Sequence, residues 1–153
     1  MQFLGIKIKM SEPTKNTQER YNALTEKMLS KMGFIVGQKL TWDDSSGGGE
    51  HMNFWIYGIE LEISEEGSTS EYKYSVKLED IPLVELLNKL HENMDTPIEV
   101  GTALTFDALE SNEDYRLTRK ITKRGTVVGI RVVVHDYRLR PSSFDPQFLK
   151  NNI

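Results

Sequence analysis

The feature that most constrains this chain is a two-residue alternation of apolar and polar side chains that recurs along much of its length. Residues 71–78 alternate cleanly, and apolar residues take alternate positions within 54–63, 97–109 and 126–139. Successive side chains of a β-strand point to opposite faces, so this period predicts strands with one buried face and one solvated face. Further strands are expected at 2–10 and 34–42. Strands should therefore dominate the fold.

Two segments instead follow a helical period. Tyr21, Leu24, Met28, Leu29 and Met32 recur at helical spacing, and they predict an amphipathic helix over about 16–32. Asn16, three residues before Glu19, resembles a helix N-cap, and Gly33 supplies the stop. A second helix is expected to begin near Asp80–Pro82 and to continue to about residue 94. Helices and mostly antiparallel strands together indicate the α+β class.

The region from residue 115 to the end is expected to divide into two parts. A tight turn at Arg124–Gly125 would join strands 115–123 and 126–139 into a hairpin. The last thirteen residues, 141–153, hold two prolines and no periodicity, so they are expected to form an arm lying across the body.

The composition excludes several kinds of chemistry. The chain of 153 residues has no cysteine, so thiol catalysis, disulfides and Cys-ligated zinc are excluded. No apolar run approaches the roughly 20 residues needed to cross a bilayer, and a signal peptide is missing at the N-terminus. A cytoplasmic protein is expected.

Charge is distributed unevenly. Residues 41–114 hold eighteen acidic and three basic side chains, whereas residues 115–140 hold eight basic ones and a single acid. The predicted hairpin 115–138 could dock on an acidic protein or on nucleic acid. Its candidate partner-binding residues are Arg116, Lys120, Lys123 and Arg124. Nucleic acid is not favoured, because exposed aromatic residues for base stacking are scarce and the whole chain is acidic. The simpler alternative is that acidic and basic segments neutralise each other in the fold.

The order of predicted elements repeats. A strand, a helix and further strands occupy 1–66, and the same order recurs over 71–140. A duplicated β-α-β-β-β module is the simplest description, with 141–153 as the C-terminal arm of one compact domain. Two such modules would enclose a cleft, where small-molecule sites tend to form. Sheet edges of this kind often pair between chains, so a homodimer is an open expectation.

Several stretches resemble the vicinal oxygen chelate superfamily, which includes glyoxalase I, extradiol dioxygenases and the bleomycin and fosfomycin resistance proteins. The likeness lies in "MLSKMGF" (28–34), "FWIYGIELEI" (54–63) and "YSVKLEDIPLVELLNKLHENM" (74–94). Metal-dependent members place one His or Glu on each of four strands. The matching positions here are Gly5, Glu62, a position near Lys73, and His135.

Glycine cannot bind a metal and lysine would repel one, so two of the four positions fail. The resemblance therefore implies the metal-free branch, with no catalytic metal and no cofactor, whose members bind a ligand between the modules. Candidate cleft residues are Trp42, Trp55, Tyr57, Glu62, Tyr74 and His135.

The stretch "SSGGGEH" (45–51) is the most conspicuous loop. Its glycines lie between two strands, whereas phosphate-binding glycine loops lie between a strand and a helix. The acidic residues around them would also repel a phosphate. A flexible hairpin loop is expected at Gly47–Gly49, and His51 has no metal-ligand spacing to Glu50. His51 could still meet Glu62 and His135 across strands.

Three functions remain open after this reading. The first is a non-catalytic protein that binds a small ligand or partner in the cleft. The second is a small regulator or inhibitor, including one encoded by a mobile element, that docks through the basic hairpin. The third is a metal-dependent lyase or dioxygenase.

Overall fold

The computed structural model describes residues 13–44, 50–69, 72–92, 98–111 and 118–151. The elements in chain order are α2 (Pro13–Lys31), β1 (Lys39–Asp44), β2 (Glu50–Glu65), β3 (Tyr74–Lys77), the 3-10 helix η1 (Leu78–Asp80), α3 (Leu83–Glu92), β4 (Ala103–Ser111), β5 (Thr118–His135), β6 (Pro141–Phe144) and α4 (Pro146–Asn151). The expected strand 2–10 and the loop Gly47–Gly49 lie outside the described residues. The α+β class is confirmed.

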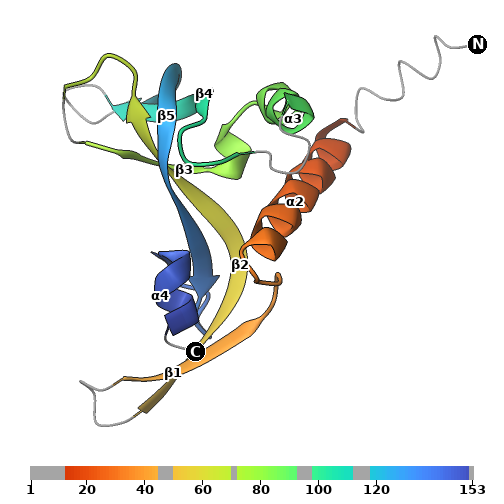
Figure 1. Cartoon of the computed structure of the whole chain (residues 1–153), viewed down its shortest axis with the longest axis vertical. Helices are drawn as coiled ribbons and strands as arrows, with labels where there is room; N and C mark the ends of the chain where they lie inside the picture. The colour runs from red at the N-terminus through yellow and green to blue at the C-terminus, as the bar shows by residue number, and fades with distance from the viewer. Residues whose placement is uncertain (1–12, 45–49, 70–71, 93–97, 112–117, 152–153) are drawn as a thin grey trace, which may run out of the picture.

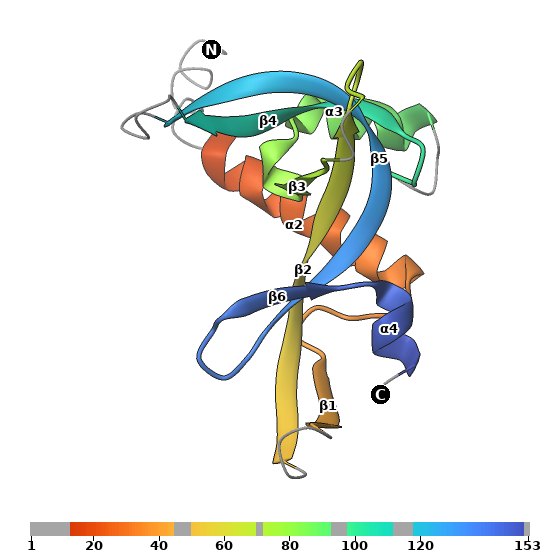
Figure 2. The same ribbon diagram turned by 90° about the vertical axis from the view of Figure 1, so that its left-hand side faces the viewer.

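The six strands form one antiparallel sheet built around two long strands. The path runs β1-β2-β5-β4, with β3 paired to the far part of β2 and β6 paired to the end of β5. Figures 1 and 2 show β2 and β5 as a long twisted ribbon. At one end of this ribbon lie β3, β4 and α3, and at the other lie β1, β6 and α4, while α2 runs from the first end to the middle of the ribbon (Figures 1 and 2).

The expected two-module architecture is not confirmed. β2 belongs to the first expected module and β5 to the second, yet the two strands pair directly over residues 55–65 and 125–135. A single hydrophobic cluster includes Leu61, Val132 and Leu149, one from each expected part of the chain.

Two irregularities in the β2–β5 pairing change which side chains face the core. Tyr57 is an extra residue between the pairs Ile56–Val134 and Gly58–Val133. Val128 is likewise skipped between Gly129 and Val127. A β-bulge inserts one residue and reverses the side-chain alternation beyond it. The single inward parity expected for 55–63 and for 128–134 is therefore wrong: Tyr57 and Val128 are exposed, whereas Ile56 and Val127 are buried.

The hairpin expected at Arg124–Gly125 is absent, because β5 runs unbroken through this point. Gly125 is paired with Leu104 of β4 and with Glu65 of β2, so it marks the place where β5 exchanges one partner strand for the other. A Cβ at Gly125 would lie 2.4 Å from the carbonyl oxygen of Ser64. The glycine therefore permits a close crossing of two strands, not a turn.

The helices and the tail show smaller differences from expectation. α2 begins at Pro13, so Asn16 lies inside the helix and is not its cap. Gly33 ends this helix in a left-handed conformation with φ 89°, as expected. The tail is more ordered than an aperiodic arm, because it contributes β6 and α4, and Leu149 of α4 is fully buried.

A side-chain hydrogen bond joins α2 to the segment that follows η1. The hydroxyl of Tyr21 donates a hydrogen bond to the carbonyl of Ile81, directly after η1. Burial raises the pKa of Tyr21, and the neighbouring Glu79, Asp107 and Asp80 act in the same direction.

Within the described part of the chain, no helix has the length and apolar character needed to span a membrane.

Candidate functional site

A groove of about 440 Å³ lies between α2 and the strands β2 and β5. Thr25 and Glu26 of α2 form one side, and Tyr57, Gly58 and Glu60 of β2 form part of the other. Val133 of β5 also lines it, next to Gly58 in the sheet. The Tyr57 bulge therefore lies at the edge of the groove, where β-bulges often redirect a side chain at binding sites.

Trp55, Tyr57 and His135 come together beside this groove, and we call them the aromatic shelf. Trp55 is opposite His135 in the β2–β5 register, and their rings stack with centroids 5.9 Å apart at 22°. The Tyr57 ring lies 5.3 Å from the imidazole at 45°. Tyr57 is 44% exposed and belongs to both the shelf and the groove lining. Three of the six predicted ligand-binding residues thus form one cluster.

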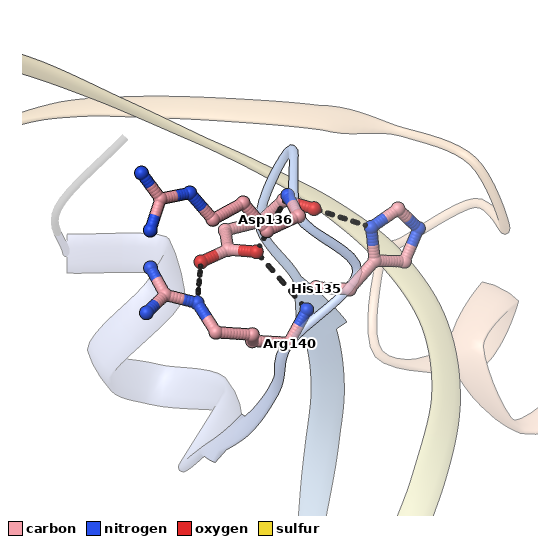
Figure 3. A network of polar contacts seen from close by, with 4 residues as sticks. His135, Asp136 and Arg140 are labelled. Atoms are coloured by element: carbon pink, nitrogen blue, oxygen red, sulfur yellow. Dashed lines mark hydrogen bonds and ion pairs between the residues drawn. The ribbon is translucent and has the colours of Figure 1, made fainter.

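The shelf is held by the turn that follows β5 (Figure 3). His135 Nδ1 lies 2.9 Å from the carbonyl oxygen of Asp136, so Nδ1 carries the proton of this hydrogen bond. In the neutral ring, Nε2 is then the acceptor. Figure 3 shows the imidazole and the Asp136 carboxylate pointing to different sides, as expected for sequence neighbours.

The Asp136 carboxylate organises the turn. It accepts hydrogen bonds from the backbone N–H groups of Arg138 at 2.9 Å and Arg140 at 3.0 Å, and from Arg140 Nε at 2.8 Å. Desolvation opposes ionisation of this carboxyl, but the hydrogen bonds from Arg140 and Arg138 outweigh it and lower the pKa of Asp136. Asp136 is committed to the turn and does not form a dyad with His135.

Charged groups line the groove unequally. The lining holds three acidic residues, Glu26, Glu60 and Glu79, and one basic residue, Lys77, which lies opposite Glu60 in the β2–β3 pairing. Glu60 is positioned by a chain of hydrogen bonds across the sheet: Arg131 Nε donates to Ser143 Oγ at 3.0 Å, and this hydroxyl donates to Glu60 Oε1 at 3.2 Å.

The other three predicted ligand-binding residues lie elsewhere. Trp42 stacks on Phe54 at 4.6 Å, on the opposite face of the sheet from Trp55, so the two tryptophans do not wall one cleft. Glu62 is opposite Gly129, further along β2. Tyr74 packs against Phe106 at 5.4 Å and is paired with Ile63, roughly 25 Å along β2 from Trp55 at the usual rise of a strand.

Two of the four predicted partner-binding residues, Lys123 and Arg124, make ion pairs with acidic residues of the chain. Lys123 makes an ion pair with Glu65 at 2.9 Å, and Arg124 lies 3.5 Å from Glu66. The hydrogen bond from Lys123 lowers the pKa of Glu65. Lys120 is exposed, and Arg116 lies outside the described residues. Acidic and basic segments neutralise each other here, as the simpler reading of the charge pattern expected.

No metal centre can be assembled from the part of the chain that the structure describes. Among those residues, no three His, Asp or Glu side chains lie close enough to hold an ion. The backbone of His51 pairs with that of Asp43, and its side chain lies outside the described set.

Sequence reasoning missed the helix side of the groove. Thr25 and Glu26 read as the polar face of an amphipathic helix, and nothing in their spacing points to a site. Gly58 did carry a signal, because a glycine inside an alternating strand indicates a bulge.

Comparison with known protein families, curated proteins and solved structures finds no match to this chain.

Proposed function

We propose that this is a non-catalytic binding protein that holds a small ligand in the groove beside the aromatic shelf. The observation that carries the proposal is the junction at Tyr57, where a formed groove meets the exposed ring of the aromatic shelf. Small-molecule sites are typically concave and largely apolar, with a few placed polar groups and aromatic walls. The Gly58 and Val133 surface supplies apolar lining, and Glu60 supplies a fixed polar group.

Binding accounts for these features without a reacting group. The proton on His135 Nδ1 is used by a backbone carbonyl, and the Asp136 carboxylate is used by the turn. Covalent catalysis usually needs a nucleophile in contact with a base. The proposal assigns no such pair to the groove.

The resemblance to metal-free members of the vicinal oxygen chelate superfamily stays part of the proposal. In its favour, the groove draws on residues from both expected modules, with Glu26 and Glu60 from the first and Lys77 and Val133 from the second. A ligand site between modules would require such a shared lining.

Intrinsic fluorescence offers a direct test, because the chain has two tryptophans in different settings. Trp42→Phe leaves Trp55 on the shelf as the sole reporter. A library of small metabolites would be screened against this variant by thermal shift and by Trp55 emission. We expect at least one compound to raise the melting temperature and to change the emission.

Tyr57→Ala should raise the dissociation constant of such a compound about tenfold, which is the loss expected for an aromatic contact of roughly 1.4 kcal/mol. Tyr72→Ala is the matched control, since Tyr72 is also exposed but lines a different part of the sheet. Failure to find any ligand, or ligands that bind Tyr57→Ala and the parent equally, would contradict the proposal.

A further inference from the structure

We infer that the groove selects an organic cation: a small ligand with an ammonium or guanidinium group on an apolar or aromatic body. The inference rests on the proposed function and adds the chemical class of the ligand. Four features of the groove support it: its charge, the positioning of Glu60, the hydroxyl of Thr25 in its wall, and the adjacent rings.

The first feature is the excess of carboxylates. Glu26 on α2, Glu60 on β2 and Glu79 on η1 surround the groove from three elements, with Lys77 as the single basic residue in its lining. A cleft lined by one sign of charge and walled by protein concentrates its field and raises the local concentration of the opposite ion. Lys77 and Arg131 lie opposite Glu60 on the two neighbouring strands and offset part of this charge, so the excess that remains in the lining is carried by Glu26 and Glu79.

The second feature is that Glu60 is held in position before any ligand arrives. Ser143 donates to Oε1 of Glu60, and Arg131 holds this serine through both Oγ and the main-chain carbonyl, at 3.0 and 2.7 Å. Arg131 thus directs two of its donors to Ser143. A carboxylate fixed in advance binds a cation with a smaller loss of side-chain entropy.

The third feature is Thr25, which is a polar side chain buried in the groove wall. It is 7% exposed and is the one polar residue in the buried set of the described chain. It lines the groove, and no hydrogen bond joins its hydroxyl to another described residue. No buried side-chain nitrogen or oxygen of the described residues lacks a partner, so this hydroxyl is open to water in the groove, and a donor on a bound ligand would replace that water.

The fourth feature is the aromatic shelf. The faces of tyrosine and tryptophan rings attract cations within about 6 Å of the ring centroid, and this attraction strengthens in desolvated sites. Tyr57 offers such a ring at the groove edge, and His135 and Trp55 extend it. Carboxylates on one side and rings on the other form a site that a cation with an apolar body fits better than an anion does.

The test uses three probes of similar shape and different charge: phenethylammonium, 2-phenylethanol and 3-phenylpropionate. Each would be titrated into Trp42→Phe by calorimetry and by Trp55 emission at low and high salt. We expect phenethylammonium to bind at least about tenfold more tightly than the other two, and we expect salt to reduce this preference.

Charge-neutralising variants identify the source of the preference. Glu60→Gln keeps the oxygen that accepts from Ser143 and removes the charge, so it should reduce ammonium binding severalfold, and so should Glu26→Gln. Glu66→Gln is the matched control, because Glu66 is exposed, pairs with Arg124 and lies outside the groove lining. Circular dichroism and melting temperature would confirm that each variant is folded.

The possible outcomes separate this inference from the proposed function. Equal or tighter binding of the alcohol or the carboxylate overturns the inference, and so does a lack of binding by all three probes. If the library screen then yields a neutral or anionic ligand that Tyr57→Ala weakens, the proposed function stands without the cation preference. If neither screen nor probes give binding, both fail.

Discussion

Leu139 shows how one residue can carry strain to hold a turn. It has φ 62°, the left-handed region that costs a residue with a Cβ about 1–2 kcal/mol, and its side chain is 72% exposed. Its N–H donates to the carbonyl of Asp136 at 2.9 Å, so the strained backbone completes the same turn that positions His135. The strained conformation of Leu139 therefore helps to position His135 of the shelf, and its exposed side chain adds nothing to the hydrophobic core.

Leu139→Gly should therefore raise the free energy of unfolding by about 0.5–1 kcal/mol, since the relief of strain exceeds the entropy that glycine adds to the unfolded chain. Urea denaturation would measure it. Arg138→Gly is the control, because Arg138 has no positive φ and glycine there should destabilise by a similar amount. A loss of stability in Leu139→Gly would contradict the account.

At the scale of elements, β5 is one strand because glycine stands where two backbones cross. The sequence around Arg124–Gly125 has the composition of a turn and by itself predicts a hairpin there. The contact with Ser64 of β2, which only the fold brings close, gives Gly125 its role.

Gly125→Ala should lower the free energy of unfolding by about 1–3 kcal/mol, because its Cβ would lie 2.4 Å from the Ser64 carbonyl and 2.8 Å from Ile63 Cγ2. Gly58→Ala provides the comparison on the partner strand, since its nearest neighbour would be Val133 Cβ at an ordinary 3.9 Å. Equal melting temperatures for Gly125→Ala and the parent would show that the crossing is looser than described.

At the scale of the whole molecule, the C-terminal segment completes the core at the β1 end. Phe144 and Phe148 lie 5.7 and 6.3 Å from Trp42, and Leu149 is fully buried. A short segment without periodicity is typical of an extended arm. This one instead packs its own Phe144 and Leu149 against the β1 end of the sheet and covers apolar side chains there.

Leu149→Ala should lower the free energy of unfolding by about 2–5 kcal/mol, which is the range for truncating a buried leucine. In a Trp55→Phe background, the remaining Trp42 would report the change as emission shifted to longer wavelength at sub-denaturing urea. Gln147→Ala on the exposed side of α4 should leave both stability and emission unchanged. An unaltered Trp42 signal in Leu149→Ala would mean that α4 is not part of this core.

The sequence by itself determined the α+β class, both major helices, and the location of most strands. These depend on side-chain period and on local signals such as Gly33, and such signals act between residues a few positions apart. It also named Trp55, Tyr57 and His135 as residues of one site, although it grouped them with Trp42, Glu62 and Tyr74, which lie elsewhere.

The tertiary structure alone decided which face each of those side chains takes and what lies next to it. One bulged residue at Tyr57 and another at Val128 reverse the alternation, and a bulge depends on the register with a partner strand far away in the sequence. The pairing of β2 with β5 in a single sheet, the place of Trp42 on the opposite face, and the meeting of Thr25 with Glu60 across the groove have the same origin. Long-range register and helix docking minimise exposed apolar surface over the whole chain, and no local pattern encodes that global minimum.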